Sequence, residues 1–340
     1  MMHYPKVAVV ILNYNGRIHL ERFLPFVYNS TYPNLQLILG DNASTDDSVA
    51  YVESCFPNIS IIKNETNYGY AEGYNQVLKK VEADYFVLLN SDVEVTDNWI
   101  EPVIKLMESD PLIAAAQPKV RSWAYRRHFE YAGAAGGFID RLGYPFCRGR
   151  IFDTLEEDTG QYDDAIEVFW ASGAALFIKK KYWDQVGGFD SHFFAHMEEI
   201  DICWRLKNFG YKIMYCPDSL VFHVGGGTLE ATNPRKTYLN FRNSLTMLQK
   251  NLPLKRSAPA IFSRYWLDFI ALLRFAAYGK FKHARAINQA HIDFTKRLFQ
   301  LRKISAKTTP EFNSAGLYKG SIVWEYFVLR KRRFKELNNL

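Results

Sequence analysis

The first 120 residues alternate short, continuously apolar runs with stretches of helical periodicity. The apolar runs, which we expect to form strands, are Val7–Leu12, Leu35–Leu39, Ile59–Ile62, Tyr85–Leu89 and Ile113–Ala116. The helical stretches between them are His19–Tyr28, Asp46–Cys55, Ala71–Val81 and Trp99–Glu108. Strands without polar alternation are typical of a parallel sheet that is covered on both faces. The pattern therefore predicts an α/β fold built from strand–helix–strand crossovers.

This rhythm changes after residue 120. Residues Arg121–Gln161 are rich in glycine and aromatic residues and predict a long, partly ordered loop, and long loops are often functional. Further along we expect strands at Glu167–Ile178 and Lys212–Tyr215, helices at Lys180–Val186 and from Glu198 to about Phe209, and a loop through His223. After Pro234 the pattern predicts helix to the C-terminus.

Charge is distributed unevenly along the chain. The formal net charge of the 340 residues is +6, but residues 1–234 carry a net −11 and residues 235–340 a net +17. The basic C-terminal extension therefore suits an anionic partner. Within it, Ala258–Tyr278 is long enough to span a membrane, but Arg264, Asp268 and Arg274 interrupt its apolar residues. A helix that lies on a bilayer surface or packs on the body fits better.

Composition excludes several classes of protein. A hydrophobic content of 48% is too high for a disordered chain. The four scattered cysteines lack the spacing of zinc ligands and indicate reduced thiols. The N-terminal residues have the pattern of a first strand rather than of a signal peptide, which predicts a cytoplasmic protein.

Ligands of an open α/β sheet bind beyond the carboxyl ends of its strands. The residues that follow the first, second and fourth expected strands are Asn13, Asp41 and Asn90–Ser91–Asp92. Asp41 lies in the stretch LGDNASTDDS. There it is either an acceptor for a nucleobase N–H or a ribose hydroxyl, or part of a helix cap.

The stretch ETNYGYAEGYNQ contains the small residues Gly69, Ala71 and Gly73 at the start of a helical pattern. Such residues let the backbone approach a ligand closely, and a helix N-terminus favours anions. No G-x-G-x-x-G follows the first strand, which argues against a dehydrogenase.

Two further stretches carry potential metal ligands. LLNSDVEV ends a buried strand with Asn90, Asp92 and Glu94 at alternate positions, and Mg²⁺ and Mn²⁺ prefer such oxygen ligands. The alternative is an ordinary aspartate at a strand-to-turn junction. VFHVGGGT adds His223, although a lone histidine is more often structural.

The stretch FFAHMEEIDICWR places Glu198, Glu199 and Asp201 within four residues. Their mutual repulsion should raise the pKa of at least one carboxyl group, which suits a general base. The alternative is an acidic helix start that the helix dipole favours. Arg205 lies four residues after Asp201, so these two side chains can pair on one helix face.

Together, five segments resemble the family 2 glycosyltransferases over about residues 6–250, and most closely the rhamnosyltransferase-like branch that builds bacterial surface polysaccharides. The matching segments are VAVVILNYNG, DNASTDDS, NYGYAEGYN, NSDVEV and EEIDICWR. The resemblance implies the GT-A fold, a Rossmann-like, mostly parallel sheet flanked by helices. We accordingly expect a catalytic domain at residues 1–234, with its nucleotide-sugar half at 1–120 and its acceptor half at 121–234. A helical, basic region at 235–340 follows.

The resemblance also assigns roles to residues. Asp41 matches the aspartate that contacts the pyrimidine of the donor, beside Asn13, and Asn67 and Gly69 match a turn near the nucleotide. Asp92 matches the last carboxylate of the DXD metal motif, which implies Mg²⁺ or Mn²⁺ as cofactor.

This sequence departs from the metal motif, because Asn90 stands where its first aspartate would be. Glu94 or His223 would then compensate. Glu199 matches the second position of the family's ED motif, the general base, with Glu198 and Asp201 as the alternatives.

The implied reaction is an inverting transfer. The base takes the proton of an acceptor hydroxyl, which displaces the diphosphate of a UDP- or dTDP-linked sugar in one step. Arg148, Arg150 and Arg242 are candidates for binding the diphosphate.

The implied acceptor is a saccharide, in particular a lipid-linked one. An anionic membrane surface on the inner face of the cell membrane and a homodimer are further options. We expect no nucleic-acid partner, because the acidic body would repel a phosphate backbone. Two rival functions are a sugar nucleotidyltransferase and a catalytically inactive nucleotide-sugar-binding module.

Overall fold

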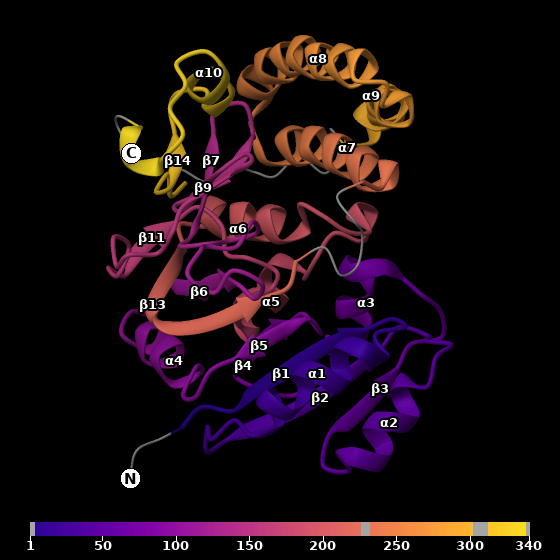
Figure 1. The fold of residues 1–340 in the computed structure, drawn as a ribbon, viewed down its shortest axis with the longest axis vertical. Coiled ribbons are helices and arrows are strands. Elements are labelled where there is room, and N and C mark those ends of the chain that lie inside the picture. The colour runs from indigo at the N-terminus through magenta and orange to yellow at the C-terminus, as the bar shows by residue number, and fades with distance from the viewer. Residues whose placement is uncertain (1–3, 226–231, 302–311, 338–340) are drawn as a thin grey trace.

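The computed structural model describes residues 4–225, 232–301 and 312–337, which form a central sheet with further layers on its two faces (Figure 1). The sheet has nine strands in the order β11-β13-β6-β12-β4-β1-β2-β3, with β5 paired to β13. The strands are β1 (Val7–Asn13), β2 (Leu35–Asp41), β3 (Ser60–Lys63), β4 (Tyr85–Leu89), β5 (Val93–Val95), β6 (Ile113–Ser122), β11 (Ile166–Val168), β12 (Ala175–Lys179) and β13 (Lys212–His223). Strands β3, β2, β1 and β4 are parallel neighbours, as are β6 and β13, whereas β12, β11 and β5 run antiparallel to their neighbours.

Helices cover both faces of the sheet, as the unbroken apolar strands predict. Val7 and Val9 of β1 share one core with helices α1 (Arg17–Tyr28), α2 (Ser48–Cys55) and α4 (Glu101–Glu108). Ala8 and Val10 share the other with α3 (Gly69–Leu78), α5 (Lys180–Val186) and α6 (Glu198–Asn208). Each fully buried aliphatic side chain of this kind contributes about 1.5–3 kcal/mol. The predicted α/β fold is confirmed, and most elements of the first 120 residues begin and end close to their predicted bounds. The exceptions are β6, which continues past its predicted end at Ala116 to Ser122, and the short strand β5, which was not predicted.

The expectation of a long loop at Arg121–Gln161 is wrong, because these residues form most of a second sheet. Its order is β10-β9-β8-β7-β14. The strands are β7 (Gly137–Asp140), β8 (Pro145–Cys147), β9 (Arg150–Ile151), β10 (Thr154–Leu155) and β14 (Leu317–Tyr318). Strands of two to four residues are too short to show a periodic pattern, and β14 comes from the far end of the chain.

Two expectations for the middle of the chain also need correction. The single strand predicted at Glu167–Ile178 is two strands, β11 and β12. Ser172 lies between them, where its N–H donates to Gln117 Oε1 (2.9 Å) and its hydroxyl to the Ala132 carbonyl (2.6 Å). These hydrogen bonds keep the segment between β11 and β12 out of the strand pairing of the sheet. The strand predicted at Lys212–Tyr215 continues through a register shift to His223, where a loop was expected.

The chain beyond Pro234 begins with three helices, α7 (Pro234–Asn251), α8 (Leu254–Ala277) and α9 (Phe281–Leu301). The prediction of helix to the C-terminus fails after them, because β14 precedes the short helix α10 (Ile322–Phe327). The helix predicted at residues 302–311 lies outside the described residues. In the part of the chain that the structure describes, no helix is both long and apolar enough to cross a bilayer.

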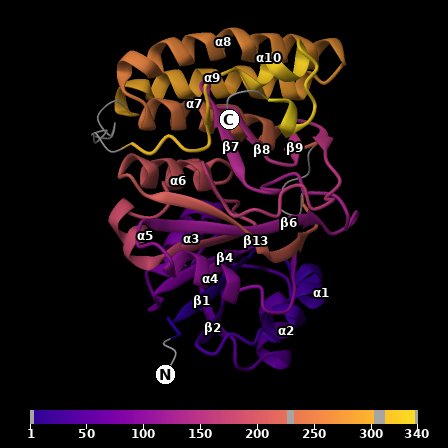
Figure 2. The ribbon, with the colours of Figure 1, turned by 90° about the vertical axis from the view of Figure 1, so that its left-hand side faces the viewer.

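A buried carboxylate joins α7 to α6, and α8 packs in turn on α7 (Figure 2). Asp201 is fully buried in α6. Its oxygens accept hydrogen bonds from Arg205 Nε (2.8 Å), Lys250 Nζ (3.1 Å) and Asn251 Nδ2 (2.8 Å), the last two from α7. Leu245 and Leu248 of α7 belong to the same core as α6. The helical extension therefore packs on the body through α7. Packing on the body was one of the two alternatives expected for the extension; the other was a helix that lies on a bilayer surface.

Substituting Asp201 tests this junction. We expect Asp201→Asn to lower the free energy of unfolding by about 3 kcal/mol, because Arg205 and Lys250 would lose a buried counter-charge. Urea titration would measure the change. Glu53→Gln is the control, since Glu53 pairs with Lys63 at the surface, where both side chains are more than half exposed. That substitution should cost less than about 1 kcal/mol. Equal losses in the two variants would contradict the assigned role of Asp201.

Candidate functional site

The candidate nucleotide site lies at the carboxyl ends of β1 and β2. Asn13 and Asp41 pair in register at these ends, and both are buried. Asn13 Nδ2 donates to Asp41 Oδ1 (3.1 Å) and to Ser48 Oγ (2.8 Å), and the Ser44 N–H donates to Asp41 Oδ2 (3.1 Å). Helix α2 begins only at Ser48, after Asp47, so Asp41 is not its cap. Asn13 therefore orients the Asp41 carboxylate.

Asn42 holds the neighbouring turn, a role that the sequence did not reveal. Its Nδ2 donates to Asn67 Oδ1 (3.0 Å) and to the Gly69 carbonyl (2.9 Å). Its Oδ1 accepts from Asn64 Nδ2 (3.1 Å). The turn that contains Asn67 and Gly69 is thus fixed beside the end of β2. The sequence feature that could have indicated this role is the pair Asp41-Asn42 at the end of an expected strand.

Gly69 brings this turn against the segment that precedes α6. Its φ is +76°, and a Cβ there would lie 2.6 Å from the Phe194 ring. The Phe194 carbonyl accepts hydrogen bonds from the N–H groups of Tyr70 (2.7 Å) and Ala71 (3.1 Å). A protein carbonyl therefore occupies the first amides of α3, where an anionic ligand was expected. Gly69 allows two backbone segments to approach each other.

A second cluster centres on His223, at the end of β13. Its Nε2 lies 3.2 Å from Asp92 Oδ1 and 3.4 Å from Asn90 Nδ2, and its Nδ1 lies 3.3 Å from Glu130 Oε2. Asp92, Glu130 and His223 are all buried. The structure thus brings together Asn90, Asp92 and His223. Glu130 was missed, because it lies in the glycine-rich segment without a recognisable motif.

The charges of this cluster shift one another. Burial alone would lower the pKa of His223, but Asp92 and Glu130 raise it well above its usual value. Burial alone would raise the pKa values of the two carboxyl groups, but His223 holds both below their usual range. The cluster is therefore an imidazolium between two carboxylates.

Glu94 lies away from this cluster. It pairs in register with Phe222, so its side chain is on the opposite face of β13 from that of His223. Its carboxylate accepts from Trp123 Nε1 (3.0 Å) and forms an ion pair with Arg126. The structure does not bring Glu94 to Asp92 and His223. Within the described ranges, no three His, Cys, Asp or Glu side chains are arranged to hold a metal ion.

The three carboxylates of α6 have different environments. Those of Glu198 and Glu199 each have a buried Oε2 without a hydrogen-bond partner among the described residues. Burial, and then the charge of Glu199, raises the pKa of Glu198 well above its usual value. Burial raises the pKa of Glu199 to about 7, against the N–H groups of the helix start, which lower it. Asp201 is occupied by its three donors, so it is a structural residue.

Gly173 connects the start of α6 with the end of β4. A Cβ on Gly173 would lie 3.8 Å from Glu199 Cβ, and the Tyr70 hydroxyl donates to the Gly173 carbonyl (2.8 Å). The next carbonyl, that of Ala174, accepts from the Asn90 N–H (3.0 Å). The carboxylates of α6 and the cluster around His223 are therefore on neighbouring segments. Tyr70 and Gly173 carried no signal in the sequence.

All three candidate arginines make contacts within the protein, and Arg150 donates its Nε–H to the Phe152 carbonyl (2.7 Å). Arg148 is buried, and its guanidinium bonds both carboxylate oxygens of Asp164 (2.9 and 3.0 Å). Arg242 donates to the carbonyls of His192 (2.8 Å) and Phe193 (3.0 Å). These contacts make both residues structural. Arg150 stacks 3.3 Å from the centre of the Tyr131 ring, and its charge helps to lower the pKa of Glu130.

Comparison with known proteins agrees with the predicted fold. Residues 8–170 match the model of glycosyl transferase family 2. The N-acetylglucosaminyl-diphospho-decaprenol L-rhamnosyltransferase of Mycobacterium tuberculosis is 25% identical over 231 residues, which are 64% of this chain and 75% of that protein.

Solved structures are similar in fold. One is residues 1–349 of TarS from S. aureus in complex with UDP-GlcNAc, with a TM-score of 0.58, 14% identity and coverage of 88% of this chain and 83% of that one. Another is the mannosyltransferase PcManGT from Pyrobaculum calidifontis with GDP-Man and Mn²⁺, with a TM-score of 0.54, 15% identity and coverage of 89% and 85%. The fold is GT-A.

The contact between Gly69 and Phe194 can be tested with two glycine substitutions. Gly69 and Gly187 both have a φ of +76°, but a Cβ on Gly187 would meet no atom within 4 Å. We expect Gly187→Ala to cost about 1–2 kcal/mol of stability through backbone strain alone. Gly69→Ala should cost roughly 1–3 kcal/mol more, because the methyl group overlaps the Phe194 ring. Thermal and urea unfolding would show the difference, and equal losses would mean that the ring moves aside freely.

Proposed function

We propose that this chain, which matches the model of glycosyl transferase family 2 over residues 8–170, transfers a sugar from a UDP- or dTDP-linked donor to a hydroxyl of a lipid-linked saccharide, with inversion at the anomeric carbon. The family match supports the sugar transfer. The relative from M. tuberculosis is named for a diphospho-decaprenol saccharide, which supports a lipid-linked acceptor in the synthesis of a surface polysaccharide.

The donor nucleotide would bind at the ends of β1 and β2. The Asp41 carboxylate, oriented by Asn13 and the Ser44 N–H, accepts the N3–H of a pyrimidine. Uracil and thymine present the same edge to this carboxylate, so UDP and dTDP both fit it. Asn42 fixes the turn that contains Asn67, which would lie along the nucleoside.

A divalent cation fits the cluster at His223. Asp92 would hold it through a carboxylate oxygen, and the sugar diphosphate would supply further oxygen ligands. His223 would join these ligands after losing its proton, because only the neutral imidazole binds a metal ion. A bound Mg²⁺ or Mn²⁺ neutralises charge that develops on the leaving diphosphate. Glu130 fixes the imidazole from its other side. Arg150 would add a positive charge next to this cluster.

Glu199 would be the general base, and its environment is the observation that carries the proposal. Its carboxylate has a buried oxygen without a partner among the described residues, and its pKa is raised to about 7. A base with a pKa near the working pH is deprotonated often enough and still binds a proton well. Burial and the charge of Glu199 raise the pKa of Glu198 well above its usual value, and Asp201 is occupied by cations.

In the proposed reaction, the acceptor hydroxyl displaces the nucleoside diphosphate in a single step. Glu199 takes the proton of the acceptor hydroxyl, whose oxygen attacks the anomeric carbon as the bond from that carbon to the diphosphate breaks. Since the attacking oxygen and the departing diphosphate occupy opposite faces, the configuration inverts. A covalent sugar–enzyme intermediate is not needed.

The base assignment predicts the effect of Glu199→Gln. The amide keeps the shape of the side chain but accepts no proton, so turnover should fall roughly 10²–10⁴-fold. Donor binding, measured by calorimetry with UDP and dTDP, should stay unchanged. Glu198→Gln is the matched variant and should keep most of the activity. If Glu198→Gln is the inactive enzyme and Glu199→Gln is not, the roles of the two residues are reversed.

The cation assignment predicts loss of transfer in EDTA and recovery with Mn²⁺ or Mg²⁺. Asp92→Ala should stay inactive after Mn²⁺ is added, because it lacks the carboxylate that holds the ion. Glu94→Ala is the control, since the structure places Glu94 with Arg126, and it should keep its dependence on the ion.

A panel of UDP- and dTDP-sugars with a lipid-linked saccharide identifies the reaction. Release of pyrophosphate from a nucleoside triphosphate mixed with a sugar 1-phosphate would indicate a nucleotidyltransferase, and donor binding without turnover an inactive module.

A further inference from the structure

The middle of helix α8 buries its charged side chains and exposes its apolar ones. Arg264 and Asp268 are 2% and 1% exposed, and their side chains form an ion pair at 3.2 Å. Tyr144 (2.9 Å) and His291 (3.0 Å) complete the surroundings of the Asp268 carboxylate. Arg264, one of the charged residues that interrupt the apolar pattern of Ala258–Tyr278, therefore points into the protein. The side of α8 that faces away from α7 and α9 lacks these charges.

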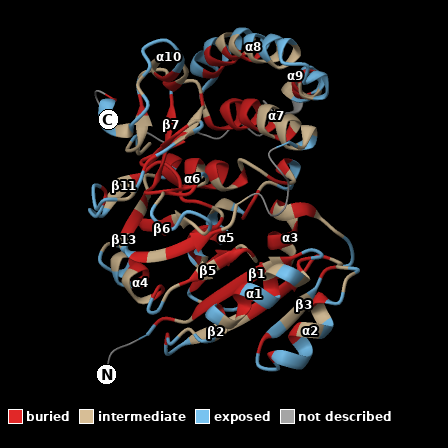
Figure 3. Cartoon of the chain, in the orientation of Figure 1, coloured by how far each residue is buried: buried red, intermediate tan, exposed pale blue. Residues whose placement is uncertain are grey.

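The outward side of α8 is an apolar stripe. Phe262 is 67% exposed, Trp266 60%, Ile270 60% and Leu273 51%. Their spacing of four, four and three residues places them on one side of the helix. Figure 3 shows the outer edge of α8 as exposed along its length. A helix in water normally has the opposite arrangement, with its polar residues outward.

The apolar stripe continues onto neighbouring elements. Tyr278 and Phe281, about 70% exposed, lie at the corner between α8 and α9. Arg274 contacts the ring of Phe327 at the end of α10, 5.4 Å from its centre, so α10 lies beside α8. Trp324 of α10 is 58% exposed. We call the surface formed by the outward side of α8, this corner and α10 the apolar end face.

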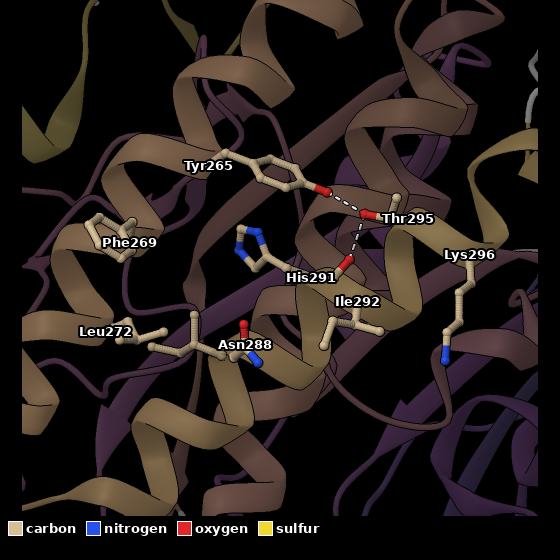
Figure 4. A pocket seen from close by; sticks show the side chains of 9 residues that line it. Tyr265, Phe269, Leu272, Asn288, His291, Ile292, Thr295 and Lys296 are labelled. Carbon is tan, nitrogen blue, oxygen red and sulfur yellow. Dashed lines mark hydrogen bonds between the residues drawn. The ribbon is translucent and has the colours of Figure 1, made fainter.

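A groove of about 510 Å³ opens beside the apolar end face, between α8 and α9 (Figure 4). Phe269 and Leu272 line it from α8, and Ile292 lines it from α9. Phe269 is half exposed, so it belongs both to the groove and to the outer surface of α8. The groove extends the apolar surface into the protein.

Cations surround the apolar end face. The exposed ones are Lys255 and Arg256 at the start of α8, Arg274 at its end, and Lys280, Lys282 and Arg285 beyond it. Every carboxylate of the described residues after Pro234 already has a partner: Asp268 has Arg264, Asp293 has Tyr238, Glu325 has Lys331, and Glu336 has backbone N–H groups. A second copy of this face would therefore bring cations against cations. An anionic surface would neutralise them.

We propose that the apolar end face docks on an anionic lipid bilayer, with its aromatic side chains among the acyl chains near the headgroups and its cations among the phosphates. An apolar stripe with cations at its border is the arrangement by which helices bind in the plane of a membrane. The groove between α8 and α9 would accommodate lipid chains displaced by the aromatic residues. This binding is independent of sugar transfer, and its test needs neither donor nor acceptor.

Vesicle co-sedimentation of the full chain tests the proposal. We expect binding to vesicles of phosphatidylcholine with phosphatidylglycerol, and weak binding to phosphatidylcholine alone. The double substitution Trp266→Glu with Ile270→Glu should weaken binding at least roughly tenfold, as should neutralising Lys280, Lys282 and Arg285 with glutamine. Phe26→Glu is the matched control, because Phe26 is 47% exposed on α1, at the far end of the molecule (Figure 1). It should bind like the unchanged protein.

A second measurement does not depend on the folding of a charged variant. Brominated lipids should quench tryptophan fluorescence of the unchanged protein, and Trp266→Phe should lose much of this quenching while it still binds. Equal vesicle binding by the double variant and the unchanged protein would overturn the proposal. So would a dimer in solution that the double variant dissociates, if the unchanged protein does not bind vesicles, because the face would then bind a second copy.

Discussion

The buried Asp201 carboxylate is the interaction on which the arrangement of the site depends. It takes hydrogen bonds from Arg205 in its own helix and from Lys250 and Asn251 in α7. A buried carboxylate without these donors would be strongly destabilising, so α6 and α7 must stay together. Helix α8 packs on α7 and is also attached directly to the rest of the chain, because the Tyr144 hydroxyl donates to Asp268 and Arg264 donates to the Leu142 carbonyl.

The same interaction determines what the other two carboxylates of α6 can do. Arg205 and Lys250 both bind Asp201, and Lys207, further along the same helix, pairs with Glu167. Among the described residues, Glu198 and Glu199 form no ion pair with a cation, and burial raises the pKa values of both. The carboxylates at His223 show the opposite effect, because the imidazolium lowers the pKa values of Asp92 and Glu130. One group of acids thus suits proton transfer and the other suits cation binding.

The sequence was sufficient for the parts of the fold in which one element shows a long, regular pattern. The strands that end at Asn13, Asp41 and Leu89 were predicted because they are apolar and fully covered. It was not sufficient where a role depends on distant partners. Glu130 acquires its role from His223, nearly a hundred residues later, and Arg148 is occupied by Asp164. Helix α8 can bury the charge of Asp268 because Tyr144 and His291 form hydrogen bonds with this carboxylate. The local sequence of α8 does not reveal these distant partners.

Titrating the carboxyl group of Glu199 is the most direct test of its proposed role as the general base. Infrared difference spectra of the unchanged protein and of Glu199→Gln, recorded across a range of pH, isolate the carboxyl band of this residue. We expect a band that disappears as the pH rises through about 7, because burial disfavours the charged carboxylate and so raises the pKa of Glu199. A band that disappears at about 4, the usual range of a glutamate in water, would contradict the assignment of Glu199 as the base.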